Sequence, residues 1–142
     1  MYLLDTNVLF ELRKRRSGKI DASVEVWAGS VDQVELYLSV ITIMEVERAI
    51  ALLERRDTRH AGVLRLWLNE KVMPAFAGRI LPVDTAIALR RARLPVPDTE
   101  SERDAWIAAT GLVHGLTIVT RNKIEFAGTG VTLFDPSTYR IS

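Results

Sequence analysis

The chain has 142 residues and a formal net charge of +1, so its overall charge excludes neither an acidic nor a basic partner. It contains no cysteine, which excludes a disulfide framework and thiolate metal sites and agrees with a cytoplasmic location. No apolar run approaches the roughly 18 residues of a transmembrane helix, and an acid at position 5 is atypical of a secretory signal. We therefore expect one domain spanning residues 1–142, in the cytoplasm and without a membrane-spanning segment.

The N-terminal part of the chain alternates short apolar segments with longer amphipathic ones. Residues 1–5 are predicted to form a buried strand and residues 6–16 a helix. After a polar break, a short helix is expected at 22–29, followed by a strand at 34–40, where VELYLSV is rich in residues that favour β-structure. A long helix is predicted at 42–56, because apolar side chains recur there at the spacing of one helix face.

The same alternation continues toward the C-terminus. A helix is predicted at 59–73, with Pro74 disturbing its end, and a short strand follows at 79–83. A helix at 85–93 stops before LPVPD, where two prolines predict an extended loop. The remaining predicted elements are a helix at 101–115 and strands at 116–120 and 131–135.

This alternation predicts a parallel sheet with helices on both faces. Such sheets bind ligands beyond the carboxyl ends of their strands. Asp5 follows the first strand directly, so its carboxylate is expected at that edge. The simpler interpretation is that Asp5 only caps the following helix, and position alone leaves both interpretations open.

Other polar side chains are expected at the same edge of the sheet. Glu45 is predicted in the first turn of the helix after the second strand, and Asp104 lies early in an apolar helix. Asn122 follows the strand at 116–120. Each acid has a simpler interpretation as a capping residue or as a complement to the helix dipole. If they converge, three carboxylates and one amide from four segments meet at one place.

Three converging carboxylates repel one another and favour a bound cation. Two unit charges about 4 Å apart repel by roughly 4 kcal/mol at an effective dielectric constant near 20. An all-oxygen set of ligands favours a hard divalent ion such as Mg²⁺ or Mn²⁺ over a softer metal. Such an ion can acidify water and neutralise charge on a phosphoryl group. Metal-assisted phosphodiester hydrolysis is therefore the leading chemistry.

Four segments of the chain stand out together. They are LLDTNVL at 3–9, SVITIMEVERAI at 39–50, RDAWIAAT at 103–110 and IVTRNKIEF at 118–126. Each motif alone is weak, but together, in this order and spacing, they resemble the PIN-domain ribonucleases. The similarity extends over essentially the whole chain and is strongest to the VapC-type toxins of bacterial type II toxin–antitoxin systems.

The resemblance implies a three-layer α/β/α sandwich with a mostly parallel central sheet. It also implies an endoribonuclease in which Asp5, Glu45 and Asp104 bind Mg²⁺ or Mn²⁺ and act in catalysis, together with Asn122. The implied partners are an RNA substrate, a cognate antitoxin and a second copy of the chain in a homodimer or hetero-oligomer. The residues implied to orient ligands or contact the substrate are Thr6, Asn7, Thr120 and Arg121.

The sequence departs from the family pattern at one corner of the site. The fourth family position is often Asp, whereas here it is Asn122, with Glu125 one helical turn later. The loss of one charge leaves open whether one or two metal ions bind. The roles of Glu125 and of Asp98, which lies in the proline-rich loop, also remain open.

Three alternative functions use the same residues differently. A phosphoacceptor signalling domain also holds Mg²⁺ in an acidic pocket, but it usually has paired acids after the first strand and a lysine after the last, which this chain lacks. An aspartyl phosphatase needs a second acid two residues after the first, where this chain has Asn7. A PIN fold that binds RNA or a partner without cutting it is the third alternative.

Two basic clusters and two apolar helix faces are further candidate contact surfaces. The clusters at 13–16 and 90–93 either contact RNA phosphates or are solvated helix ends. The apolar faces at 43–53 and 63–72 either contact a second copy or the antitoxin, or pack in the core.

Overall fold

The computed structural model describes residues 1–95 and 102–140 and contains a five-stranded sheet in the order β3-β2-β1-β4-β5. Every neighbouring pair of strands is parallel, as the alternation of strands and helices predicted. The strands are shorter than expected, because each stops where the chain turns into the next helix or loop. They are β1 (Tyr2–Leu4), β2 (Leu36–Ser39), β3 (Ile80–Leu81), β4 (Thr117–Val119) and β5 (Leu133–Phe134).

Successive residues of the strands point to opposite faces of the sheet and enter two separate cores. Leu4 belongs to the larger core, together with Leu38 and Val119. Leu3 belongs to the smaller core, together with Ile118. Both cores are apolar, so the sheet is covered on both faces and the three-layer α/β/α arrangement is confirmed.

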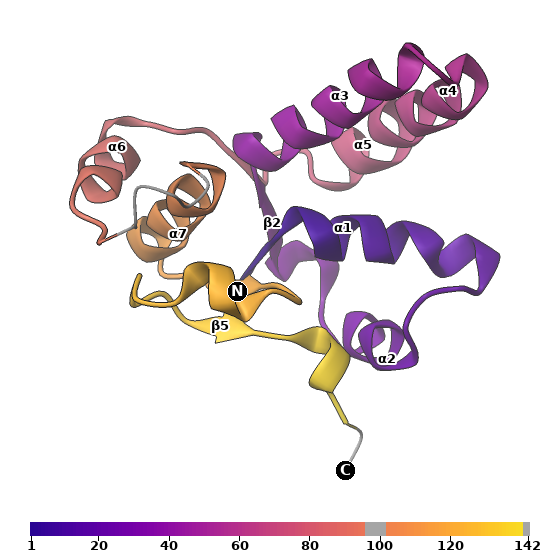
Figure 1. Ribbon diagram of the computed structural model, residues 1–142. Coiled ribbons are helices and arrows are strands. Elements are labelled where there is room, and N and C mark those ends of the chain that lie inside the picture. Colours follow the sequence, from indigo (N-terminus) through magenta and orange to yellow (C-terminus); the bar gives the residue numbers. More distant parts are fainter. Residues whose placement is uncertain (96–101, 141–142) are drawn as a thin grey trace.

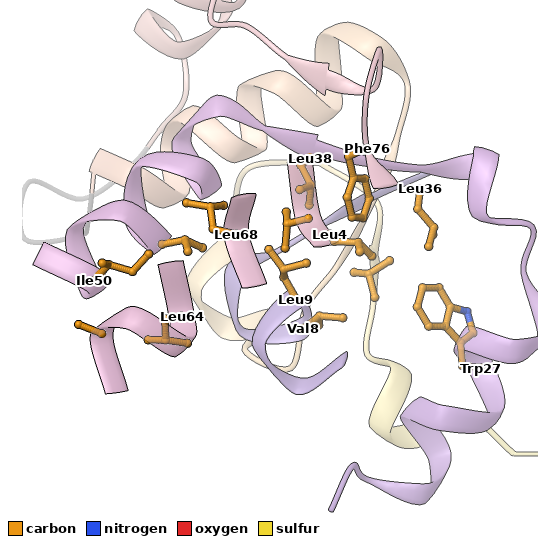
Figure 2. Close-up of a cluster of buried hydrophobic side chains, with 14 residues drawn as sticks. Leu4, Val8, Leu9, Trp27, Leu36, Leu38, Ile50, Leu64, Leu68 and Phe76 are labelled. Atoms are coloured by element: carbon orange, nitrogen blue, oxygen red, sulfur yellow. The ribbon is translucent and has the colours of Figure 1, made fainter. Parts of the chain in front are cut away.

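The larger core is closed by the helices of the N-terminal half. Figure 2 shows its side chains, with Val8 and Leu9 from the first helix and Trp27 from the second packed toward the strands. In Figure 1 the third and fourth helices form a hairpin that extends beyond the sheet. These elements are α1 (Thr6–Arg13), α2 (Ala22–Ser30), α3 (Val40–Glu54), α4 (Thr58–Trp67) and α5 (Met73–Ala75).

The smaller core is closed by α7 (Glu102–His114), and α6 (Thr85–Ala92) packs against it on the same side (Figure 1). Position 101, which was predicted to open this helix, lies outside the described residues, as does Asp98. No helix within residues 1–95 and 102–140 is long and apolar enough to cross a membrane.

The helix predicted at 6–16 is shorter than expected. Its α-helical part ends at Arg13, and a 3-10 helix, Lys14–Ser17, continues to Gly18. Gly18 has a φ of 71°, which glycine adopts without a steric penalty and which ends the helix. Other 3-10 helices, which were not predicted, lie at Gln33–Glu35, Lys123–Phe126 and Pro136–Thr138.

The helix predicted at 59–73 is disturbed near its end, as expected from Pro74, although the chain stays helical to Ala75. A π-helical turn, Leu68–Val72, follows α4 and leads into α5, which contains Pro74. The ring of proline crowds the preceding turn, and a wider turn relieves this crowding. The chain therefore stays helical across the proline.

Helix α7 lies against the sheet because residue 111 has no side chain. A Cβ placed on Gly111 would lie 3.0 Å from Cγ2 of Val131 and 3.2 Å from Cγ1 of Ile118. Asp104 lies two turns earlier on the same helix. The close approach at Gly111 therefore fixes the position of Asp104 at the edge of the sheet.

We expect Gly111→Val to lower the free energy of unfolding by about 1–3 kcal/mol, since the added methyl groups overpack this contact. Gly62→Ala is the matched control, because Gly62 lies in α4 with nothing within 4 Å of a Cβ. That control should gain about 0.5–1 kcal/mol from helix propensity. Urea unfolding monitored by circular dichroism measures both, and a Gly111→Val protein as stable as the wild type would contradict the packing argument.

Candidate active site

The candidate site lies where the strand order of the sheet reverses. From β1 the sheet extends to β2 on one side and to β4 on the other. At such a switch point the loops after the two central strands diverge and leave a crevice at the carboxyl edge. Asp5 follows β1 directly and Thr120 follows β4 directly, so both lie at this point.

Asp5 is fully buried, with 0% of its surface exposed, and each carboxylate oxygen is oriented by donors. Oδ1 accepts the Thr6 backbone N–H at 2.9 Å and Nη1 of Arg103 at 3.0 Å. Oδ2 accepts the Thr120 hydroxyl at 2.8 Å and the Asn7 side-chain amide at 3.0 Å. Asp5 therefore caps α1, as the simpler interpretation proposed, and is also the centre of a polar network.

Glu45 is brought beside Asp5 by α3. The helix begins earlier than predicted, at Val40, because the hydroxyl of Ser39 accepts the Ile41 N–H at 3.0 Å. Glu45 therefore lies in the second turn rather than the first. Its Oε1 accepts the Thr6 hydroxyl at 2.5 Å.

The surroundings of Glu45 make its carboxyl group more basic. Burial raises the pKa of Glu45, and the charges of Asp5 and Glu125 raise it further. The Thr6 hydrogen bond and the Arg103 guanidinium act in the opposite direction without cancelling the shift.

Asp104 lies at the start of α7 and is almost fully buried. The pKa of Asp104 is raised to about 6. Burial is the largest cause, the neighbouring acids Glu125, Asp5 and Glu45 also raise the pKa, and the attraction of Arg103 offsets part of the shift. Oδ1 of Asp104 lies 2.9 Å from Nη2 of Arg103 but accepts no hydrogen bond of acceptable geometry. The three acids predicted from the sequence thus meet at one place.

The fourth corner of the cluster is formed by Glu125 rather than Asn122. Glu125 lies on the 3-10 helix Lys123–Phe126, with Oε2 3.5 Å from Nη2 of Arg103. Asn122 is exposed, and its backbone N–H donates to the Thr120 hydroxyl at 3.1 Å. Within the described residues its side-chain amide forms no hydrogen bond to the acids. A catalytic role of Asn122 stays a prediction.

The residues predicted to contact the substrate contact one another or the acids in this structure. Thr120 is fully buried, and its hydroxyl donates to Asp5. Asn7 accepts the Arg121 backbone N–H at 3.2 Å, and Nη1 of Arg121 donates to Glu11 at 3.1 Å. Contacts of Thr6, Asn7, Thr120 and Arg121 with substrate stay predictions.

Glu11 and Arg103 contribute to the site and were not identified from the sequence. Glu11 is buried in α1, and the backbone N–H of Asp21 lowers its pKa most, followed by Lys14 and Arg121. Its sequence neighbours gave no signal for this role. Arg103 had a signal, since it directly precedes Asp104 in RDAWIAAT, but it was considered only as part of the motif.

Arg103 lies among the four acids. Nε is 2.9 Å from Oε2 of Glu45, in addition to the contacts of Nη1 with Asp5 and of Nη2 with Asp104 and Glu125. Among the ion pairs of residues 1–95 and 102–140, no other basic side chain contacts these acids. The three nitrogens of one guanidinium therefore neutralise part of the charge of four carboxylates.

The cluster fits a hard divalent cation by its chemistry. It consists of carboxylate oxygens, and Oδ1 of Asp104 is buried without a hydrogen-bond donor. However, no three or more acidic, histidine or cysteine side chains in the described parts of the chain are arranged so that they could hold a metal ion. The carboxylate oxygens therefore suit a divalent cation, but in this structure they are arranged around Arg103.

The two basic clusters lie at different distances from the acids. The cluster 13–16 is at the end of α1 remote from Asp5, since the helix separates Thr6 from Arg13 by about 10 Å. The cluster 90–93 is nearer, because Nη2 of Arg91 lies 2.7 Å from Oε1 of Glu102, the residue before Arg103. The second cluster is the one that borders the site.

Comparison with known families agrees with the geometry. Residues 2–130 match the PIN domain family. The chain is 36% identical to toxin FitB of Neisseria gonorrhoeae over 96% of this chain and 98% of FitB. It is 33% identical to VapC ribonuclease Y4jK of Sinorhizobium fredii over 96% of this chain and 97% of that protein. The chain therefore belongs to the PIN-domain family, among its VapC-type toxins, and the resemblance stated from its motifs is confirmed.

Solved structures show the same fold. The crystal structure of FitAcB from Neisseria gonorrhoeae matches 97% of this chain and 99% of its own, with a TM-score of 0.85 and 34% identity. A toxin–antitoxin complex from Klebsiella pneumoniae matches 99% of this chain and 100% of its own, with a TM-score of 0.65 and 26% identity.

The raised pKa of Asp104 predicts how stability depends on pH. Its carboxyl binds a proton more tightly in the folded state, with a pKa of about 6, than in the unfolded state, near 3.8. The ionised group therefore destabilises the fold increasingly as the pH rises between these values. In EDTA, Asp104→Asn should raise the free energy of unfolding by about 3 kcal/mol above pH 6, with a smaller gain toward pH 4.

Urea unfolding at a series of pH values between 4 and 8 measures this difference. Asp57→Asn, an exposed acid at the start of α4, controls for the isosteric exchange. If the gain in the free energy of unfolding of Asp104→Asn decreases as the pH rises, the pKa of Asp104 is not raised in the folded state.

Proposed function

We propose that this VapC-type toxin is a Mg²⁺- or Mn²⁺-dependent endoribonuclease that hydrolyses phosphodiester bonds of RNA in the cytoplasm. The observation that carries the proposal is the convergence of Asp5, Glu45, Asp104 and Glu125, from four separate segments, at the switch point of the sheet. The ribonuclease name of the Sinorhizobium relative supports the same activity.

Asp5, Glu45 and Asp104 are the residues that would hold the ion. When bound, such an ion lowers the pKa of water and neutralises charge that develops on a phosphodiester. The four hydrogen bonds to Asp5 hold its carboxylate in place, so this ligand costs little reorganisation. The raised pKa and partial exposure of Glu45 suit it to accept a proton from an attacking water.

The basic cluster at 90–93 is the better candidate for contacts with the RNA backbone. It borders the acids through the Arg91–Glu102 pair, whereas the cluster at 13–16 lies at the far end of α1. Lys and Arg side chains that neutralise phosphates supply most of the affinity for nucleic acid. RNA bound along α6 would pass the carboxyl edge of the sheet.

A PIN fold that binds RNA without cutting it is the second candidate function. The observation that favours it is the guanidinium of Arg103 among the acids, together with the absence of a ready metal-binding group in the described residues. The two candidates differ in whether RNA is cleaved, so one experiment separates them.

That experiment is cleavage of a fluorogenic single-stranded RNA by the purified protein in Mg²⁺, Mn²⁺ or EDTA. We expect cleavage in either metal and none in EDTA. Asp5→Asn should lower the rate by at least about 100-fold, since it removes one charge at the centre of the cluster. Asp57→Asn is the control, because it makes the same exchange at an exposed helix cap. Equal rates for wild type and Asp5→Asn would indicate a contaminating nuclease, and binding without cleavage would favour the second candidate.

The toxin is further proposed to be held by a cognate antitoxin. The complex from Klebsiella pneumoniae supports a partner of this kind. A groove of about 980 Å³ lies between α1, the end of α2 and the α4–α5 segment. Its apolar residues include Leu9, Leu12, Val63, Leu66 and Trp67, and its basic residues include Lys71 and the cluster 13–16.

The groove has the chemistry to bind an apolar segment that also carries acidic residues. The guanidinium of Arg13 lies 5.8 Å from the centre of the Trp67 ring, so charge and apolar surface are adjacent. Leu66 is 57% exposed. Of the two apolar faces, the buried parts around Ile50 and Leu64 belong to the core, and the exposed part of the face at 63–72 lines this groove. The expected homodimer belongs to this proposal as well.

Expression of the chain alone is expected to stop bacterial growth, and co-expression of the antitoxin should restore it. Leu66→Glu should remain toxic but be rescued poorly, since it places a charge on the apolar floor of the groove. Leu52→Glu is the matched control, because Leu52 is similarly exposed, at 54%, on α3 outside the groove. Growth curves with and without the antitoxin measure the effect. Full rescue of Leu66→Glu would place the antitoxin elsewhere.

A further inference from the structure

Arg103 is the basic residue that contacts all four acids of the cluster, and the family resemblance gave it no role. Its side chain is 21% exposed and reaches the cluster from the first turn of α7. Its three nitrogens lie 2.9–3.5 Å from the oxygens of four carboxylates. This is the position that a cation shared by the same carboxylates would take.

We propose that Arg103 and a divalent cation exclude each other at this cluster, so that Arg103 neutralises the acids in the cation-free protein and weakens cation binding. This inference rests on the proposed function. It adds that a side chain of the protein itself competes with the divalent cation for the acids.

The first argument is that both cations need the same oxygen atoms. Nη1 is within 3.0 Å of Oδ1 of Asp5, and Nε is within 2.9 Å of Oε2 of Glu45. A Mg²⁺ ion requires its oxygen ligands at about 2.0–2.1 Å, in near-octahedral geometry. An ion at that distance from both oxygens would clash with the guanidinium and repel its charge.

The second argument is that the cluster in its present form is spread around Arg103. The described parts of the chain hold no group of three or more acids placed to bind a metal ion, although four acids contact the same guanidinium. The carboxylates must therefore move closer to one another to bind an ion. They cannot do so while the planar guanidinium lies between them.

The third argument is that the carboxylates provide what holds Arg103 in this place. A positive charge in the first turn of a helix opposes the helix dipole, so α7 itself does not favour it. Once an ion neutralises the acids, the attraction that holds the guanidinium is lost. The exchange is therefore reciprocal, because each cation weakens the binding of the other.

The test is Mn²⁺ binding to the full chain, measured by isothermal titration calorimetry and by the Mn²⁺ paramagnetic resonance signal. Arg103→Gln should bind Mn²⁺ at least about tenfold more tightly than wild type, since a neighbouring opposite charge changes carboxylate affinities by this order. Arg91→Gln is the matched control, because Arg91 pairs with Glu102 beside the cluster without contacting the four acids. It should change the affinity by less than about threefold, because its charge is paired with Glu102 and does not contact the four acids.

A second measurement uses the wild-type protein, in case the variant does not fold. In a nitrogen-15 spectrum of the arginine side chains, Mg²⁺ should shift the Nε–H signal of Arg103 toward that of free arginine. The Nε–H signals of Arg15 and Arg91 serve as internal controls, since both donate to glutamates away from the four acids. The chemical shifts of these two signals should not change on addition of Mg²⁺.

The outcomes separate this inference from the proposed function. Tighter Mn²⁺ binding by Arg103→Gln supports the exclusion, and so does a Mg²⁺-dependent shift of the Arg103 Nε–H signal toward that of free arginine. If Asp5→Asn abolishes Mn²⁺ binding but Arg103→Gln binds no more tightly than wild type and the Nε–H signal stays fixed, the exclusion is wrong and the metal site stands. If neither wild type nor Arg103→Gln binds Mn²⁺, both the metal-dependent function and the exclusion are overturned.

Discussion

Four carboxylates cannot be packed at one edge of a sheet unless positive charge or protons compensate them, and this constraint organises the site. Burial and the neighbouring acids together raise the pKa of Asp104 to about 6. The guanidinium of Arg103 supplies one positive charge, and hydrogen bonds stabilise the negative charge of the Asp5 carboxylate. The remaining repulsion destabilises the cation-free fold and is the free energy that a bound cation can recover. Stability and ligand binding therefore depend on the same electrostatic imbalance.

The position of the site could be predicted from the sequence because it follows from the topology. Apolar segments of strand length that alternate with helices predict a parallel sheet, and residues directly after the strands then lie at the carboxyl edge. Asp5 and Thr120 are of this kind, and no knowledge of side-chain contacts is needed to place them. Asp104 could be predicted at the same edge because it lies early in an apolar helix. The boundaries of the helices were less predictable, because Pro74 is accommodated by a π-helical turn that local rules do not anticipate.

The division of roles within the site could not be predicted, because it depends on distances between segments far apart in the sequence. The hydrogen bond from the Thr120 hydroxyl to Asp5 joins residues 115 positions apart in the chain. Glu125 rather than Asn122 completes the cluster, since the 3-10 helix that begins after Asn122 turns the glutamate inward. Arg103 was known as a neighbour of Asp104 in the chain, but only the fold places its guanidinium among acids from three other segments. Local sequence patterns carry no information about such pairings.

The attachment of Asp5 to the sheet has a consequence for how the four acids can rearrange. Its backbone N–H donates to the carbonyl of Val119 at 2.9 Å, so the residue extends the hydrogen-bonded ladder between the two central strands. The backbone of Asp5 therefore keeps its place for as long as the sheet is folded. Any closer approach of the acids has to come from side-chain rotation and from the helical segments that carry Glu45, Asp104 and Glu125.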